Sequence, residues 1–164
     1  MTYGEYMNFA RVDETICAGS LPNSVADLKT IADNGCQYVV SLTRASLIGR
    51  GDITANSLQF FFKGWLHAPA IDGAVPPNMP EILDFIDHAQ ANHESVFLHC
   101  RWGLGRTGTT MLAWYKRHGL AVPEIIEKWQ RAKPNAWVYN QLAVPYNTDQ
   151  RAYITDVLGY SGLW

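Results

Sequence analysis

The sequence lacks the features that mark several large classes of protein. Cysteine is scarce: there are three in 164 residues, at no metal-like spacing, which favours free thiols in a reducing compartment such as the cytoplasm over a disulfide framework. The net charge of −2 supplies no basic field for nucleic acid or an anionic membrane. No apolar run is long enough to span a bilayer, and the first residues lack the regions of a signal peptide. We therefore expect a cytoplasmic protein that binds neither nucleic acid nor membrane.

The composition that remains is that of an ordinary globular domain. Hydrophobic residues make up 48% of the chain and charged residues 17%, and a chain of this length can bury a real core. No internal repeat, low-complexity tract or linker divides it. We predict a single domain over residues 1–164. The sequence does not indicate an oligomeric state, so we take a monomer by default.

Candidate helices and strands alternate along the chain. Strands are predicted at 36–42, within 58–70 and at 95–100, and residues 43–58 are expected to be mostly loop. Helices are predicted at 24–35, at 78–92 with Asn78 and Glu81 framing the cap, at 107–118, at 123–133, and within 137–158, where Pro145 bends or breaks the segment. Strand–helix alternation predicts an α/β fold with a central, mostly parallel twisted sheet flanked by helices. Sites in such sheets lie at the carboxyl ends of the strands, and Cys100 lies at such an end.

The stretch "HCRWGLGRTG", residues 99–108, joins a predicted strand to a predicted helix. The backbone N–H groups of a glycine-rich turn and the positive end of the helix dipole favour an anion. Gly103 and Gly105 permit a positive φ and a close approach of the anion to the backbone. The guanidinium of Arg106 can hold two oxygens of one phosphate. The same field stabilises a thiolate, so we expect Cys100 to be an ionised nucleophile directed at phosphorus.

These residues carry a resemblance. "HCRWGLGRTG" fits the His-Cys-x5-Arg-Ser/Thr signature of the protein tyrosine phosphatase superfamily. "NFARVDETICAGSLPNSVADLKTIADNGCQYVVSLT" and "HAPAIDGAVPP" resemble the N-terminal segment and the general-acid loop of small atypical dual-specificity phosphatases. The resemblance covers most of residues 8–142, and only 41–57 and the tail after 145 depart from it. It implies a cysteine-phosphatase fold and a phosphatase of protein phosphotyrosine, with phosphoserine or phosphothreonine as further substrates. The reaction would pass through a cysteinyl-phosphate intermediate and need no cofactor.

The resemblance also implies a role for each matching position. Cys100 matches the nucleophile, Arg106 the residue that clamps phosphate, and Asp72 the acid that protonates the leaving oxygen. Thr107 matches the hydroxyl that stabilises the departing thiolate, and His99 the residue that orders the loop and supports the thiolate. The loop backbone matches the phosphate cradle, which comprises Arg101, Trp102, Gly103, Leu104, Gly105 and Arg106. Gln141 is a weaker match to a water-positioning glutamine.

Several alternatives compete with this interpretation. A phosphoinositide or inositol-phosphate phosphatase would use the same loop, although only Arg101 adds charge within it. A rhodanese-like sulfurtransferase needs neither the upstream Asp72 nor the Gly-Arg-Thr-Gly exit into a helix, and a non-catalytic phosphate-binding module usually loses the cysteine, the arginine or the acid. Asp72 alone would also fit an ordinary Asp-Gly turn. The histidines are scattered without ligand spacing, so we predict no metal site. The predicted partner is a phosphorylated protein or peptide.

Overall fold

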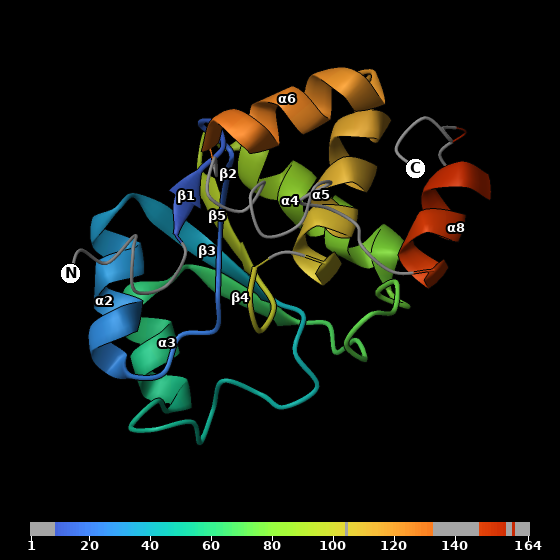
Figure 1. Cartoon of the computed structure of the whole chain (residues 1–164). Helices are drawn as coiled ribbons and strands as arrows, with labels where there is room; N and C mark the ends of the chain where they lie inside the picture. The colour runs from blue at the N-terminus through green and yellow to red at the C-terminus, as the bar shows by residue number, and fades with distance from the viewer. Residues whose placement is uncertain (1–8, 104, 133–147, 157–158, 160–164) are drawn as a thin grey trace.

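One sheet forms the centre of the molecule (Figure 1). A computed structural model of the chain describes residues 9–103, 105–132, 148–156 and 159. Within these residues, strands lie in the order β1-β2-β5-β3-β4; all neighbours are parallel except β1, which runs antiparallel to β2. The strands are β1 Ala10–Arg11, β2 Ile16–Gly19, β3 Cys36–Ser41, β4 Gly64–His67 and β5 Ser95–His99. This confirms the predicted α/β fold with a mostly parallel sheet.

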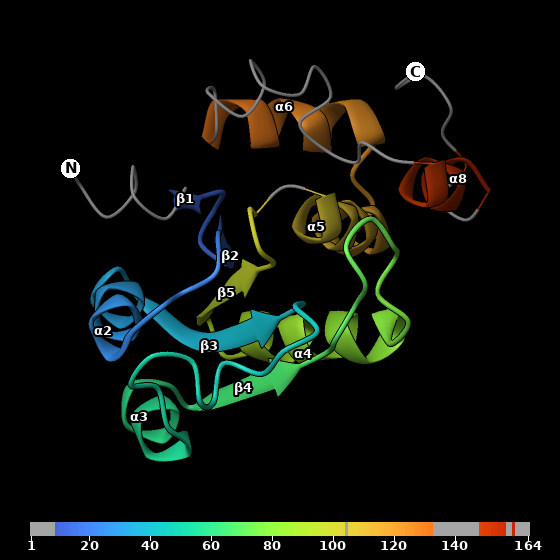
Figure 2. The same ribbon diagram turned by 60° about the horizontal axis from the view of Figure 1, so that its bottom comes forward.

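Helices cover both faces of the sheet. Helices α2 and α3 lie on one side, while α4, α5 and α6 lie on the other (Figure 2). The described helices are α2 Val25–Asp33, α3 Ala55–Phe61, α4 Met79–Ala91, α5 Gly105–Arg117, α6 Val122–Ala132 and α8 Thr148–Asp156. Two apolar clusters fill the layers, one including Leu28, Val39 and Phe97 and the other including Leu98 and Trp114. None of the described helices combines the length and apolar content needed to cross a membrane.

The helix predicted at 24–35 forms as α2, and its ends show why. Ser24 Oγ accepts the backbone N–H of Asp27 at 3.3 Å, a cap worth about 1 kcal/mol. Gly35 just beyond the helix has φ +91°, the left-handed conformation that ends many helices. The helix predicted at 78–92 also forms, as α4, and Asn78 is its N-cap residue as predicted. The Asn78 side chain makes no capping hydrogen bond.

Two features of the fold differ from the sequence-based prediction. Strands β1 and β2 were not predicted, because runs of two and four residues are too short to show alternation, and β2 is held by pairing with β5. Helix α3 occupies part of 43–58, predicted to be mostly loop. Its start is a capping box in which Thr54 Oγ1 accepts the Ser57 N–H and Ser57 Oγ accepts the Thr54 N–H. Pro145 lies outside the described residues.

The strand order brings distant loops to the carboxyl end of β5. The Leu21 N–H donates to the Arg101 carbonyl at 3.1 Å, the Leu42 N–H to the His99 carbonyl at 3.0 Å, and the Ala70 N–H to the Leu42 carbonyl at 3.1 Å. Loops that follow β2, β3 and β4 therefore meet around the residue that follows β5, which is Cys100.

Candidate active site

The loop from Cys100 to Arg106 turns directly from strand β5 into helix α5. Cys100 directly follows the last residue of β5 and is buried. Helix α5 begins at Gly105, so Arg106 and Thr107 lie in its first turn, which is buried. Gly103 has φ +77°, the left-handed conformation anticipated for this glycine, whereas Gly105 is the first residue of helix α5. Leu104, predicted as part of the cradle, lies outside the described residues.

Arg106 is buried, and its guanidinium is oriented by two backbone carbonyls. Nη1 donates to the Ala70 carbonyl at 2.9 Å and to the Leu42 carbonyl at 3.3 Å. Nε is buried and has no hydrogen-bond partner in the described part of the chain. The Nε–Nη2 edge of the guanidinium is thus the one not held by the backbone, and such an edge matches two oxygens of a phosphate.

Asp72 lies beside Arg106. Its Oδ1 is 3.6 Å from Arg106 Nη2, and the aspartate side chain is 60% exposed while that of the arginine is 5% exposed. The Ala74 N–H donates to the Ile71 carbonyl at 2.9 Å, which closes a turn around Asp72 and Gly73, and Gly73 has φ +86°. The Asp-Gly pair therefore is a turn, and that turn presents a carboxylate next to the predicted phosphate clamp.

His99 is completely buried and holds the loop through its ring. Nδ1 lies 3.0 Å from the Cys100 carbonyl; because a carbonyl only accepts, Nδ1 carries the proton. Desolvation, together with the positive charge of Arg106, outweighs that hydrogen bond and lowers the pKa of His99 to about 4. The ring is therefore neutral near pH 7. It contacts the loop backbone through this hydrogen bond and adds no positive charge beside Cys100.

The other predicted loop residues divide into buried and exposed sets. Thr107 is completely buried, and its Oγ1 has no partner among the residues that the structure describes. Arg101 and Trp102 are exposed, and the Arg101 guanidinium lies 5.3 Å from the centre of the Trp102 ring, within the range of a cation–π contact.

In the described ranges, no three His, Cys, Asp or Glu side chains form a group suited to a metal ion.

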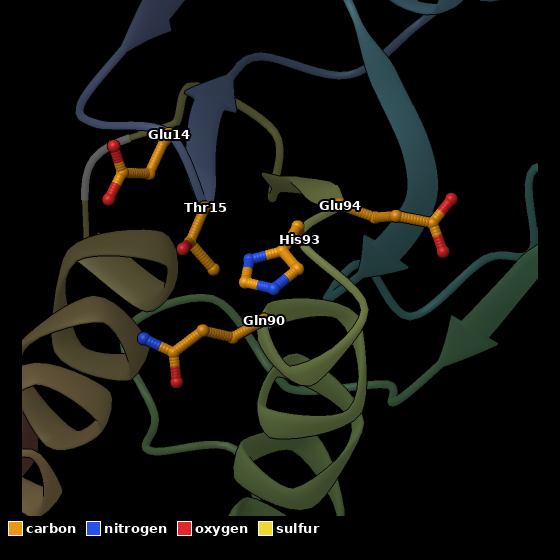
Figure 3. A pocket seen from close by; sticks show the side chains of 5 residues that line it. All are labelled: Glu14, Thr15, Gln90, His93 and Glu94. Atoms are coloured by element: carbon orange, nitrogen blue, oxygen red, sulfur yellow. The ribbon is translucent and has the colours of Figure 1, made fainter.

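A cavity of about 410 Å³ lies at the other end of the sheet and is a poor phosphate site. Thr15 and Glu94, which directly precede β2 and β5, line it together with Glu14, Gln90 and His93 (Figure 3). Two carboxylates repel a phosphate. The Glu94 carboxylate also points away from His93 in Figure 3 and pairs with Lys63. This cavity therefore does not compete with the Cys100 loop as a candidate phosphate site.

Sequence reasoning missed the groups that orient Arg106. The carbonyls of Leu42 and Ala70 carry no residue-type signal, because every residue has the same backbone oxygen. Only the strand order, which places the ends of β3 and β4 beside β5, could have indicated them. Gln141, the weaker match, lies outside the described residues.

The fold and the loop from Cys100 to Arg106 together define the class of protein to which the chain is similar. Solved structures of phosphatases of the protein tyrosine phosphatase type have the same architecture. The active form of Tk-PTP is 23% identical, with a TM-score of 0.69 over 87% of this chain and 90% of that one. PTPMT1 is 20% identical, with a TM-score of 0.69 over 87% and 88%. Human DUSP28 is 18% identical, with a TM-score of 0.61 over 82% and 89%. At these identities the likeness concerns the fold.

The sequence itself assigns the family. Residues 18–120, more than half of the chain, match the family described as "Polymorphic toxin system, DSP-PTPase phosphatase". The chain belongs to this family and is a phosphatase of the dual-specificity type. The match contains both Asp72 and the Cys100–Arg106 loop, and it ends before α6 and α8.

Proposed function

We propose that this phosphatase hydrolyses phosphate monoesters of proteins, phosphotyrosine first and phosphoserine or phosphothreonine in addition, through a phosphorylated Cys100. Arg106 and the loop backbone, including Arg101, Trp102 and Gly103, bind the phosphate. Asp72 is the general acid. His99 orders the loop, and Thr107 stabilises the thiolate when it departs.

The proposed reaction has two steps. The Cys100 thiolate attacks phosphorus, the bond from phosphorus to the substrate oxygen breaks, and the Asp72 proton passes to that oxygen. Water then attacks the phosphocysteine, its proton passes to the Asp72 carboxylate, and the S–P bond breaks. Phosphate leaves, and the thiolate and the acid are restored.

One observation carries the proposal: the guanidinium of Arg106 is fixed in a direction that serves both a phosphate and Asp72. Two carbonyls hold Nη1, and Asp72 lies 3.6 Å from Nη2. A phosphate on the Nε–Nη2 edge would place its ester oxygen near the Asp72 carboxyl group. A leaving oxygen needs a proton donor at that position.

Trapping of the intermediate tests the mechanism. The purified protein, mixed briefly with phosphotyrosine peptide and quenched in acid, should gain one phosphoryl group on the peptide that contains Cys100. Cys100→Ser should gain none and release no phosphate, because a neutral hydroxyl is a far weaker nucleophile than a thiolate. Cys36→Ser, which changes another buried thiol, should be labelled like the unchanged protein. Labelling that persists in Cys100→Ser would contradict the covalent step.

A phosphoinositide remains the second candidate substrate. PTPMT1, which shares the fold, has been solved in complex with PI(5)P. In this chain, Arg101 is the one loop cation besides Arg106, so we expect slower release from a soluble phosphoinositide than from a phosphotyrosine peptide. The opposite order would make the lipid headgroup the preferred substrate.

A further inference from the structure

A buried glutamine connects the last described helix to the loop that carries Asp72. Helix α8 lies beside the loop between β4 and α4 in both views (Figures 1 and 2). From α8, Gln150 Nε2 donates to the Ala74 carbonyl at 3.3 Å, and the Gln150 side chain is completely buried. Burial of an amide is unfavourable unless the amide is hydrogen-bonded. A glutamine at this position therefore indicates a specific polar contact.

That contact holds the turn around Asp72 at one end. Ala74 is the last residue of the turn, and its N–H already donates to the Ile71 carbonyl at 2.9 Å. The other end is held through the Ala70 carbonyl, which accepts from Arg106 Nη1 at 2.9 Å. Asp72 itself is mostly exposed, and its ion pair with Arg106 is long, at 3.6 Å. The placement of its carboxyl group thus depends on the two ends of the turn.

We infer that Gln150 is a positioning residue for the general acid. It does not touch the phosphate; it holds the Ala74 carbonyl and so keeps the Asp72 carboxyl near the leaving oxygen. The inference rests on the proposed role of Asp72. It extends that role to a helix outside the part of the chain that the family description matches, residues 18–120.

Leaving-group dependence tests the inference. Gln150→Met keeps the length and volume of the side chain and removes the donor. With phenyl phosphate, whose leaving oxygen needs a proton, kcat/KM should fall about 2- to 10-fold, the worth of one hydrogen bond. With p-nitrophenyl phosphate, whose oxygen departs more readily, kcat/KM should be nearly unchanged. Alkylation of Cys100 by iodoacetamide should keep its rate, because the phosphate loop is intact.

Asp149→Asn is the matched control. Asp149 lies on the same helix but is exposed. Its substitution should therefore leave kcat/KM unchanged for both phenyl phosphate and p-nitrophenyl phosphate. Should Gln150→Met not fold, Gln150→Asn gives the same comparison, because its amide is one methylene too short to reach the Ala74 carbonyl.

A double variant separates the two ways in which the inference could fail. In an Asp72→Asn background, Gln150→Met should cause no further loss with phenyl phosphate, because both changes remove the same proton donor. A further loss, or an equal loss with both substrates in the single variant, would overturn the role of Gln150 and leave that of Asp72 intact. An Asp72→Asn variant without leaving-group dependence would overturn the general acid itself, and with it the positioning role.

Discussion

Acid should destabilise this protein through one buried histidine. The pKa of His99 is about 4 in the folded chain, against an ordinary value of 6.5, because burial disfavours the charged ring. The unfolded chain therefore binds more protons than the folded chain between these two values. The stability associated with a neutral His99 is complete above pH 6.5 and is lost as the pH falls towards 4.

The size of the effect follows from the difference between the two values, about 2.5 pH units. One unit corresponds to about 1.4 kcal/mol, so the free energy of unfolding should fall by about 2 kcal/mol at pH 5 and about 3 kcal/mol at pH 4 from this group alone. A domain has a total stability of roughly 5–15 kcal/mol. The share that depends on a neutral His99 is thus a large part of the whole free energy of unfolding.

Urea unfolding at neutral pH and near pH 5 would measure this share. His99→Asn does not titrate in this range, so its stability should fall by about 2 kcal/mol less than that of the unchanged protein over the same interval. His93→Asn is the control: His93 is exposed and has φ +57°, a conformation that asparagine tolerates. An equal pH dependence in His99→Asn and the unchanged protein would refute the buried, neutral imidazole.

Three further predictions concern catalysis. Asp72→Asn should lower kcat/KM for phenyl phosphate roughly 10²–10⁴-fold and that for p-nitrophenyl phosphate much less; an equal loss with both would deny the acid role. Arg106→Lys should abolish most turnover with either substrate, because a point charge cannot make two parallel hydrogen bonds, and retained activity would contradict bidentate binding. The dependence of kcat/KM on pH should be bell-shaped, since the reaction needs a thiolate and a protonated acid together; a kcat/KM that rises with pH without passing through a maximum would exclude this pair.

The sequence predicted most of the sheet and the loop that joins β5 to α5 for identifiable reasons. Helix α2 carries its own signals in Ser24 and Gly35, and β3 is a short apolar run. The loop after β5 is continuous in sequence, so Cys100, Gly103 and Arg106 could be assigned together. Such features are local, and local features are those that a pattern of residues can indicate.

The remainder depends on contacts between distant segments. Strand β2 is four residues long and exists because β5 pairs with it. Residues 58–62 contain consecutive phenylalanines that favour a strand, yet Leu58–Phe61 complete helix α3, because the capping box at Thr54 starts a helix there. The Gln150–Ala74 contact joins residues far apart in the chain, and no local pattern indicates it.

The structure also restricts where the positive charge of the site comes from. His99 is neutral near pH 7 because its pKa is about 4, and Arg101 is exposed on the Trp102 ring. Among the described residues, Arg106 is then the buried cation that is available to the proposed phosphate site. The same guanidinium holds the Ala70 carbonyl and faces Asp72, so it fixes one end of the acid loop as well. We therefore expect a substitution of Arg106 to weaken phosphate binding and to misplace the proposed acid together, and we expect lysine, despite its charge, to recover neither.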